Sequence, residues 1–261
     1  MLEAGIKIGG AELSTWIAMG LLPFARITGV CMVAPVFGAL FVPAPVRIVF
    51  AVVLTAAVLQ FAPPAPPEEL GLMLLPALAR ELVIGIAMGF VTQMIFDAVV
   101  VGGQTVAMSM GLGFATMVDP SRGSVPVLSQ FYLIVATLLF LALNAHLALL
   151  RIVFESFTLL PAGNISLAST NAAAVVGFGS TMFASAIKLA LPAIIALLIV
   201  NLAFGVMSRA APSMNLFAVG FPVTMVIGFC ILTFGITNSA PALGELIASA
   251  LSLAAKLAGG G

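Results

Sequence analysis

The chain has 261 residues, of which 62% are hydrophobic and only 7% are charged. A soluble domain carries roughly 25% charged residues, and a domain of this length has too little interior to bury so much apolar surface. Nine Lys and Arg residues balance nine Asp and Glu residues, so no excess of positive charge favours nucleic acid as a partner. The composition therefore predicts an integral membrane protein.

Six stretches have the length and composition of membrane helices, because about 20 mainly apolar residues cross roughly 30 Å of hydrocarbon. They cover residues 13–33, 46–62, 72–100, 127–153, 172–202 and 216–236. A seventh stretch, residues 242–257, is shorter and can span, lie at the interface or pack on a partner. We predict an all-α, polytopic membrane protein of long, kinked hydrophobic helices that forms a single domain over residues 1–261.

Prolines and glycines separate these stretches. Proline fixes φ and removes an N–H donor, so the run from Pro63 to Pro67 predicts a rigid turn. Gly102 and Gly103 are expected to end the third stretch, and Pro192 to kink the fifth.

Charged side chains occur inside the apolar stretches, where a charge costs several kcal/mol and usually faces a cavity or a partner. Arg26, Glu81 and Lys188 are the main examples. A proton pathway and pairing between helices or subunits both explain them, and pairing is favoured because the carboxylates lie mostly near helix ends. Arg151 and Glu155 are four residues apart and are expected to pair along one helix face.

Gly85 and Gly89 form a GxxxG pattern. Small residues four apart let two helices approach closely, so the pattern indicates close helix packing.

Residues 102–124 do not have the composition of a lipid-facing helix. Five glycines interrupt the segment, and glycine weakens a helix by about 1 kcal/mol relative to alanine. Irregular backbone at membrane depth survives only inside protein or along a cavity. The segment also holds Met108, Met110 and Met117 around Phe114, which are adaptable, apolar side chains. A surface connection and a re-entrant loop that plugs a pore both remain open at this point.

Motifs of catalysis are absent. The single histidine excludes a HExxH metal site, and the chain contains no Walker A loop, no GxGxxG and no GxSxG. We expect no enzyme activity, and therefore no catalytic residues, no cofactor and no metal.

Several segments resemble the FliR family of type III export-gate membrane subunits, in the family's order and near its spacing. They include Pro23-Phe24-Ala25-Arg26, Glu81-Leu82-Val83-Ile84-Gly85 with Met88-Gly89-Phe90, Met110-Gly111-Leu112-Gly113-Phe114-Ala115-Thr116 with Val118-Asp119-Pro120, and Arg209-Ala210-Ala211-Pro212-Ser213-Met214-Asn215-Leu216-Phe217. The chain departs from the family at Ser213, where glutamine is common, and at Leu147, where a second histidine is common.

The resemblance implies a subunit of the flagellar protein export gate in the bacterial inner membrane, within the flagellar basal body. Its partners would be FliP, FliQ and FlhB-like membrane subunits, unfolded exported flagellar proteins and membrane lipid. The resemblance also implies a loop that plugs the closed pore, comprising Met110, Gly111, Leu112, Gly113, Phe114, Ala115, Thr116, Met117, Val118, Asp119 and Pro120. Helix or subunit contacts are expected at Arg26, Glu81, Gly85, Gly89, Lys188, Pro212, Met214, Asn215 and Phe217.

Three alternatives remain. An injectisome export-gate subunit belongs to the same family. A stand-alone small-solute transporter would build its site between discontinuous helices, using Pro192 and the glycine-broken segments, but the chain lacks the two related halves common in transporters. A purely structural scaffold differs from a gate subunit only in whether residues 110–120 contact the substrate.

Overall fold

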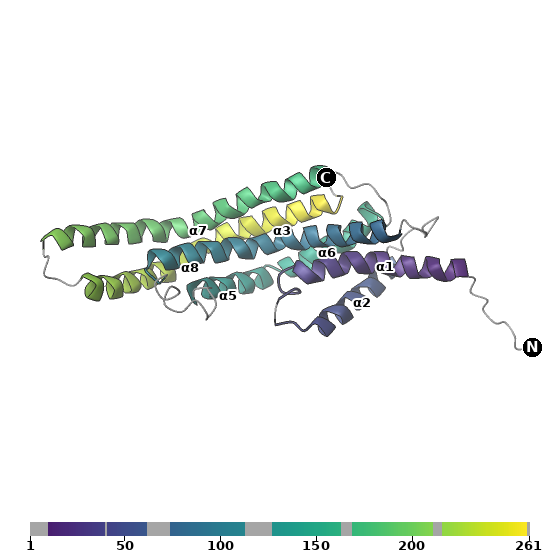
Figure 1. Ribbon diagram of the computed structural model, residues 1–261, viewed down its shortest axis with the longest axis horizontal. Coiled ribbons are helices and arrows are strands. Elements are labelled where there is room, and N and C mark those ends of the chain that lie inside the picture. The colour runs from purple at the N-terminus through teal and green to yellow at the C-terminus, as the bar shows by residue number, and fades with distance from the viewer. Residues whose placement is uncertain are drawn as a thin grey trace, which may run out of the picture. The chain divides into compact units, whose positions relative to one another are not determined.

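The computed structural model describes residues 10–39, 41–61, 74–112, 127–162, 169–210 and 216–259. All regular secondary structure in these residues is helical (Figure 1), which confirms the predicted all-α class. The helices are α1 (Gly10–Val33), α2 (Ala44–Phe61), α3 (Leu74–Ser109), α5 (Val127–Ala142), α6 (Ala145–Leu159), α7 (Ser169–Ala210) and α8 (Leu216–Leu257).

The chain divides into two compact units. Unit 1 comprises Met1–Gln93, Ala145–Val176 and Ala250–Gly261, so it holds α1, α2, the first half of α3 and α6. Unit 2 comprises Met94–Asn144 and Gly177–Ser249, so it holds the rest of α3, α5 and most of α7 and α8. The helix α3 contributes residues to both units.

In unit 1, the backbones of α1 and α3 approach closely at glycines. A Cβ atom on Gly29 would lie 2.5 Å from the carbonyl oxygen of Leu82, and a Cβ atom on Gly85 would overlap the carbonyl group of Arg26. One turn later, a Cβ atom on Gly89 would lie 3.2 Å from the carbonyl oxygen of Val30 in α1 and 3.0 Å from the backbone nitrogen of Ala34, the residue after α1. The two helices therefore pack backbone to backbone, a distance that only residues without a side chain allow. The helix α2 lies beside α1 on another face (Figure 1).

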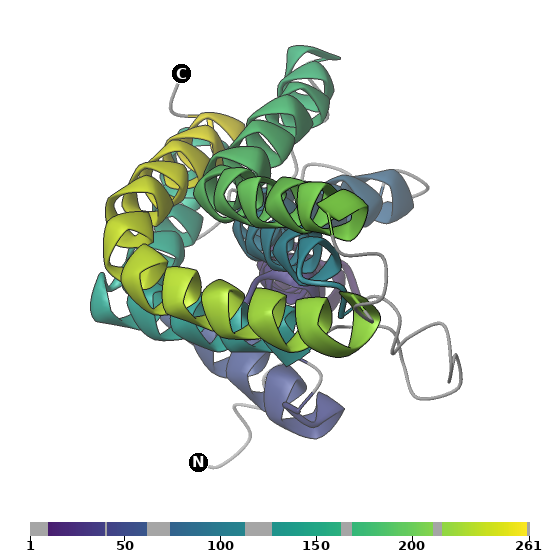
Figure 2. The same cartoon turned by 90° about the vertical axis from the view of Figure 1, so that its left-hand side faces the viewer.

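In unit 2, one side of the last turns of α3 packs against α5, α7 and α8 (Figure 2). The prediction that Gly102 and Gly103 end the helix is wrong, because α3 continues to Ser109. Both glycines are positions of close approach: a Cβ atom on Gly102 would lie 3.0 Å from the carbonyl oxygen of Ala186 in α7, and one on Gly103 would lie 3.0 Å from Cα of Ser129 in α5. Tertiary packing thus outweighs the low helix propensity of glycine.

Two other predicted boundaries are wrong. The stretch 127–153 is not one helix, because α5 ends at Ala142 and Asn144 adopts a left-handed φ of 54° before α6 begins. Asparagine tolerates this conformation, and its apolar neighbours conceal the break from a hydropathy pattern. Conversely, the stretches 216–236 and 242–257 form one continuous helix, α8, which passes through Pro222 and Pro241.

Four helical segments in the described ranges are long and apolar enough to cross a membrane: Ala44–Phe61, Leu74–Ser109, Ala172–Ala210 and Ala240–Leu257. The pair α5 and α6 makes a fifth if it is counted as one broken span. Two of the six predicted stretches correspond instead to the shorter apolar segments Met19–Val33 and Val219–Thr233. These lengths, with the apolar composition, make the chain an integral membrane protein.

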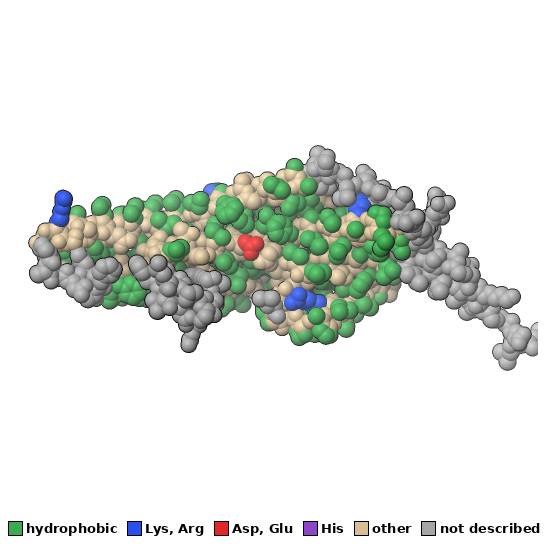
Figure 3. Space-filling view, viewed as in Figure 1, with side chains coloured by type: hydrophobic (Ala, Val, Ile, Leu, Met, Phe, Trp, Pro, Cys, Tyr) green, Lys and Arg blue, Asp and Glu red, His purple; other side chains and the backbone are tan. Residues whose placement is uncertain are grey.

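The candidate membrane helices differ in the fraction of their residues that the rest of the chain buries. In the apolar window of α3, 61% of residues are buried, but only 17% are buried in the windows of α2 and α7. Hydrophobic side chains also predominate on the face shown in Figure 3, where charged side chains are few. The apolar surfaces of α2 and α7 must therefore be covered by lipid or by other protein.

The glycine contact between α1 and α3 generates a stability prediction. Gly29→Ala should destabilise the protein by roughly 1–3 kcal/mol, because overpacking forces the two backbones apart. Gly20→Ala on the same helix is the matched control, since nothing lies within 4 Å of the added Cβ atom. Thermal unfolding in detergent, followed by loss of helical circular dichroism, measures both. Equal unfolding temperatures for the two variants would show that the close approach does not limit stability.

Candidate functional site

A buried ion pair connects α1 to α3 in unit 1. The side chains of Arg26 and Glu81 are both 0% exposed. The Nε group of Arg26 donates a hydrogen bond to Oε2 of Glu81 at 2.6 Å. The other carboxylate oxygen of Glu81, Oε1, accepts a hydrogen bond from Nη1 of the neighbouring Arg80 at 3.3 Å. Each charge thus has an opposite charge beside it, as burial in an apolar helix requires.

The other edge of the Arg26 guanidinium faces the end of α6. Its Nη1 group donates to the carbonyl oxygen of Ser156 at 2.9 Å and to Oγ of Ser156 at 3.0 Å. Its Nη2 group donates to the carbonyl oxygen of Leu160 at 2.9 Å, and the Phe157 ring centroid lies 4.4 Å from Cζ. The last carbonyls of a helix lack partners within it and carry partial negative charge, so a cation there is stabilising. Arg26 therefore acts as a C-terminal cap for α6.

This cluster is chemically suited to joining helices. Its guanidinium has well-aligned partners on two other helices, which leaves it little freedom to move or to bind a further group. The exposed pair of Arg151 and Glu155 is also present, with Nε and Oε1 2.7 Å apart, as the spacing predicted. Over the described ranges, no group of three or more His, Cys, Asp or Glu residues could hold a metal ion.

In unit 2, the end of α3 has a defined geometry. Gly111 has a φ of 82°, and its N–H donates to the carbonyl oxygen of Met108 at 3.0 Å. The N–H of Leu112 donates to the carbonyl oxygen of Ala107, also at 3.0 Å. This pair of bonds is the Schellman motif, which satisfies the last carbonyls of a helix and favours glycine at the left-handed position. We call Met110, Gly111 and Leu112 the plug root, because the predicted plug loop begins with them.

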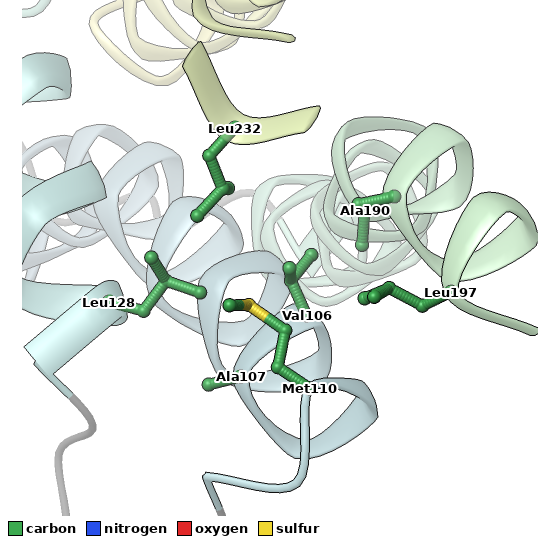
Figure 4. Close-up of a cluster of buried hydrophobic side chains, with 8 residues drawn as sticks. Val106, Ala107, Met110, Leu128, Ala190, Leu197 and Leu232 are labelled. Carbon is green, nitrogen blue, oxygen red and sulfur yellow. The ribbon is translucent and has the colours of Figure 1, made fainter. Parts of the chain in front are cut away.

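The plug root rests on the apolar core of unit 2 (Figure 4). Met110 is 1% exposed and belongs to a buried cluster drawn from four helices. Leu112 packs against the same cluster from its edge. The cluster consists of Val106 and Ala107 from α3, Met110 directly after α3, Leu128 from α5, Ala190, Ala193 and Leu197 from α7, and Leu232 from α8. The start of the predicted loop is therefore anchored by packing as well as by the helix cap.

The structure describes only part of the predicted site. Of the plug loop, Met110, Gly111 and Leu112 are described, and residues 113–120 lie outside the described ranges. The predicted contact residues Pro212, Met214 and Asn215 also lie outside them, and Phe217 lies in α8 without a described side chain. Gly85 and Gly89 face α1, and Arg26 and Glu81 pair within the chain. A role of these residues in contacts between subunits stays a prediction.

Lys188 has a neighbour that sequence reasoning did not assign to it. It lies exposed on α7 and lines a pocket of about 200 Å³ together with Glu245 of α8. Thr181, Ser185 and Ser249 line the same pocket. The only signal in the sequence was one charge of each sign in two separate apolar stretches, and it does not specify which helices lie side by side.

Comparisons with known proteins agree on one family. Residues 17–250 match the family described as bacterial export proteins, family 1. The flagellar biosynthetic protein FliR of Escherichia coli (strain K12) is 33% identical over 256 residues, which cover 97% of both chains. The proteins of the same name from Aquifex aeolicus (strain VF5) and Bacillus subtilis (strain 168) are 32% and 30% identical, and both matches cover 81% of this chain and 83% of the relative.

The buried cluster generates a prediction about Arg26. Arg26→Met should destabilise unit 1 by roughly 3–5 kcal/mol, because it leaves the Glu81 carboxylate buried beside fewer donors and removes the cap of α6. Arg26→Lys keeps the charge but cannot reach both helices with a planar fork, so its loss should be smaller. The control, Arg151→Met, removes an exposed pair and should leave stability unchanged. Denaturation in detergent with increasing urea measures the three midpoints, and an Arg26→Met midpoint as high as that of Arg151→Met would contradict a structural role.

Proposed function

The chain belongs to the bacterial export proteins, family 1, and we propose on that premise that it is a core subunit of the flagellar type III protein export gate. The observation that carries the proposal is the 33% identity to a flagellar biosynthetic protein over 97% of both chains. The described helices fit such a role, since several apolar segments of spanning length are present. The gate subunit passes protein chains through a pore and carries out no catalysis.

The gate requires partners, and the exposed apolar helices supply surfaces for them. We propose that FliP- and FliQ-like subunits cover much of α2 and α7, whose apolar windows are only 17% buried by the chain itself. An FlhB-like subunit would complete the assembly in the bacterial inner membrane, within the flagellar basal body. The flagellar branch is favoured over the injectisome because the relatives compared above carry a flagellar name.

The pore would be closed by the plug loop, residues 110–120. Two observations support this proposal. The loop starts from a fixed point, because its first residues are capped by Gly111 and packed by Met110. Its remaining residues include glycine, methionine and phenylalanine, which can seal an opening and still yield to a passing chain. Docking of substrate and cytoplasmic components would displace the loop, while the root stays with α3.

A gate subunit should assemble with its partner subunits. Co-expression with FliP- and FliQ-like subunits, extraction in mild detergent and native mass spectrometry should give a fixed hetero-oligomer that contains this chain. The physical reason is that α2 and α7 leave apolar area that a packed interface covers better than detergent. A lone monomer or homodimer in the same preparation would favour a stand-alone solute transporter and contradict the gate.

A second prediction concerns the plug. Replacing residues 113–120 by a glycine–serine linker of equal length should let small ions leak through the assembled complex, because the sealing side chains are lost while the root is kept. Conductance of the purified complex in planar bilayers measures the leak.

The matched control replaces residues 163–168, in the connection between α6 and α7, by a glycine–serine linker of equal length. It should assemble and remain closed. Equal conductance of the two variants and the unmodified complex would remove the plug from the mechanism, although membership of the gate would stand.

A further inference from the structure

The helix α8 has a glycine directly against the side chain of Met110. A Cβ atom on Gly228 would lie 2.4 Å from Cε, 2.7 Å from Sδ and 2.8 Å from Cγ of Met110. Gly228 is buried, and so are Thr224 and Leu232 one turn away on either side, at 7% and 3% exposure. Met110 therefore lies in a shallow depression on α8 that exists only because residue 228 lacks a side chain. We call this depression the Met110 seat.

Met110 could not easily give way to a larger residue in the seat. Rotation about its last side-chain bond moves Cε alone, but Sδ and Cγ also lie closer than 3.0 Å to the added atom. Only rotation about χ1 moves Cγ, and few χ1 values are open to a residue at the end of a helix. Met110 is 1% exposed and is packed within its cluster, so a rotated side chain would meet other residues of that cluster. The backbone at residue 110 would have to move instead.

Movement at residue 110 acts directly on the plug root. Met110 is the last residue of the helical turn that precedes Gly111, and its N–H donates to the carbonyl oxygen of Val106 at 3.0 Å. A side chain on Gly111 would meet ring atoms of Phe221 at 3.4 Å, so α8 also contacts the root at a second point. The α8 surface around Gly228 and Phe221 thus fixes where the chain leaves α3.

We infer that Gly228, through the Met110 seat, is a positioning residue that fixes the plug root, residues 110–112, against α8. Gly228 does not contact the passing chain in this scheme and acts through Met110. The inference rests on the proposed function, because it takes residues 110–120 to be the plug.

The test is Gly228→Ala in the full complex. The added methyl group should displace Met110, and bilayer conductance of the purified complex should rise severalfold while the amount of assembled complex is unchanged. Gly220→Ala is the matched control on the same helix, because it is also buried and its added Cβ atom would meet the Phe204 ring at 3.9 Å, an ordinary contact. Equal conductance of the two variants would overturn the inference.

A second substitution, at Met110, distinguishes a positioning role of Gly228 from a general packing defect in α8. Met110→Ala removes the three atoms that collide with the added methyl group. In that background, Gly228→Ala should therefore cause no further leak. If Gly228→Ala alone prevents assembly, the double variant should restore it. A leak or assembly defect of equal size in both backgrounds would overturn the inference.

The linker variant of residues 113–120 separates this inference from the proposed function. If the linker variant leaks and Gly228→Ala does not, only the positioning role fails. If the linker variant does not leak, the plug itself fails, and the positioning role fails with it. If both leak, Gly228→Ala should add nothing to the linker variant, because no sealing segment remains to be positioned.

Discussion

The charge on Arg26 is the constraint on which the packing of unit 1 depends. An ionised side chain with no access to water must be neutralised and hydrogen-bonded, and here the partners come from α3 and from the end of α6. Three helices must consequently meet at one point. The carbonyl group of the same residue abuts Gly85, so the polar contact and the closest backbone approach occur at one residue of α1. A shift of α1 along α3 would disrupt both at once, which explains how helices without amphipathic faces obtain a single register.

The helices could be predicted from the sequence because apolar runs of spanning length have few alternatives in a membrane. The boundaries of the helices could not be predicted as well. Gly102 and Gly103 looked like a helix end and proved to be contact points with α7 and α5, whereas the helix-ending glycine is Gly111. Residue type alone cannot separate these roles, since both use the absence of a side chain. The difference lies in which atoms are nearby, and those atoms belong to helices distant in the sequence.

The same limit applied to the candidate site. Charges inside apolar stretches indicated that Arg26 and Glu81 needed partners, but not that one partner would be the end of α6. The composition of residues 102–124 indicated an unusual segment, but its helical first part could not be separated from the loop. The role of Gly228 could not be predicted, because a glycine in an apolar helix carries no signal until the side chain opposite it is known.

Glycine therefore has two structural roles in this protein. In unit 1 it brings backbones together, and in unit 2 at Gly228 it makes room for a side chain that precedes the proposed plug. The first use fixes helices permanently, because backbone cannot yield. The second use fixes the start of the proposed plug, because the buried Met110 side chain fits against α8 only where residue 228 has no side chain. A gate needs both: helices that stay fixed when a chain passes, and a fixed point from which a closing element can move. The large apolar area left exposed on α2 and α7 supplies a third requirement, surfaces on which other subunits can complete the frame.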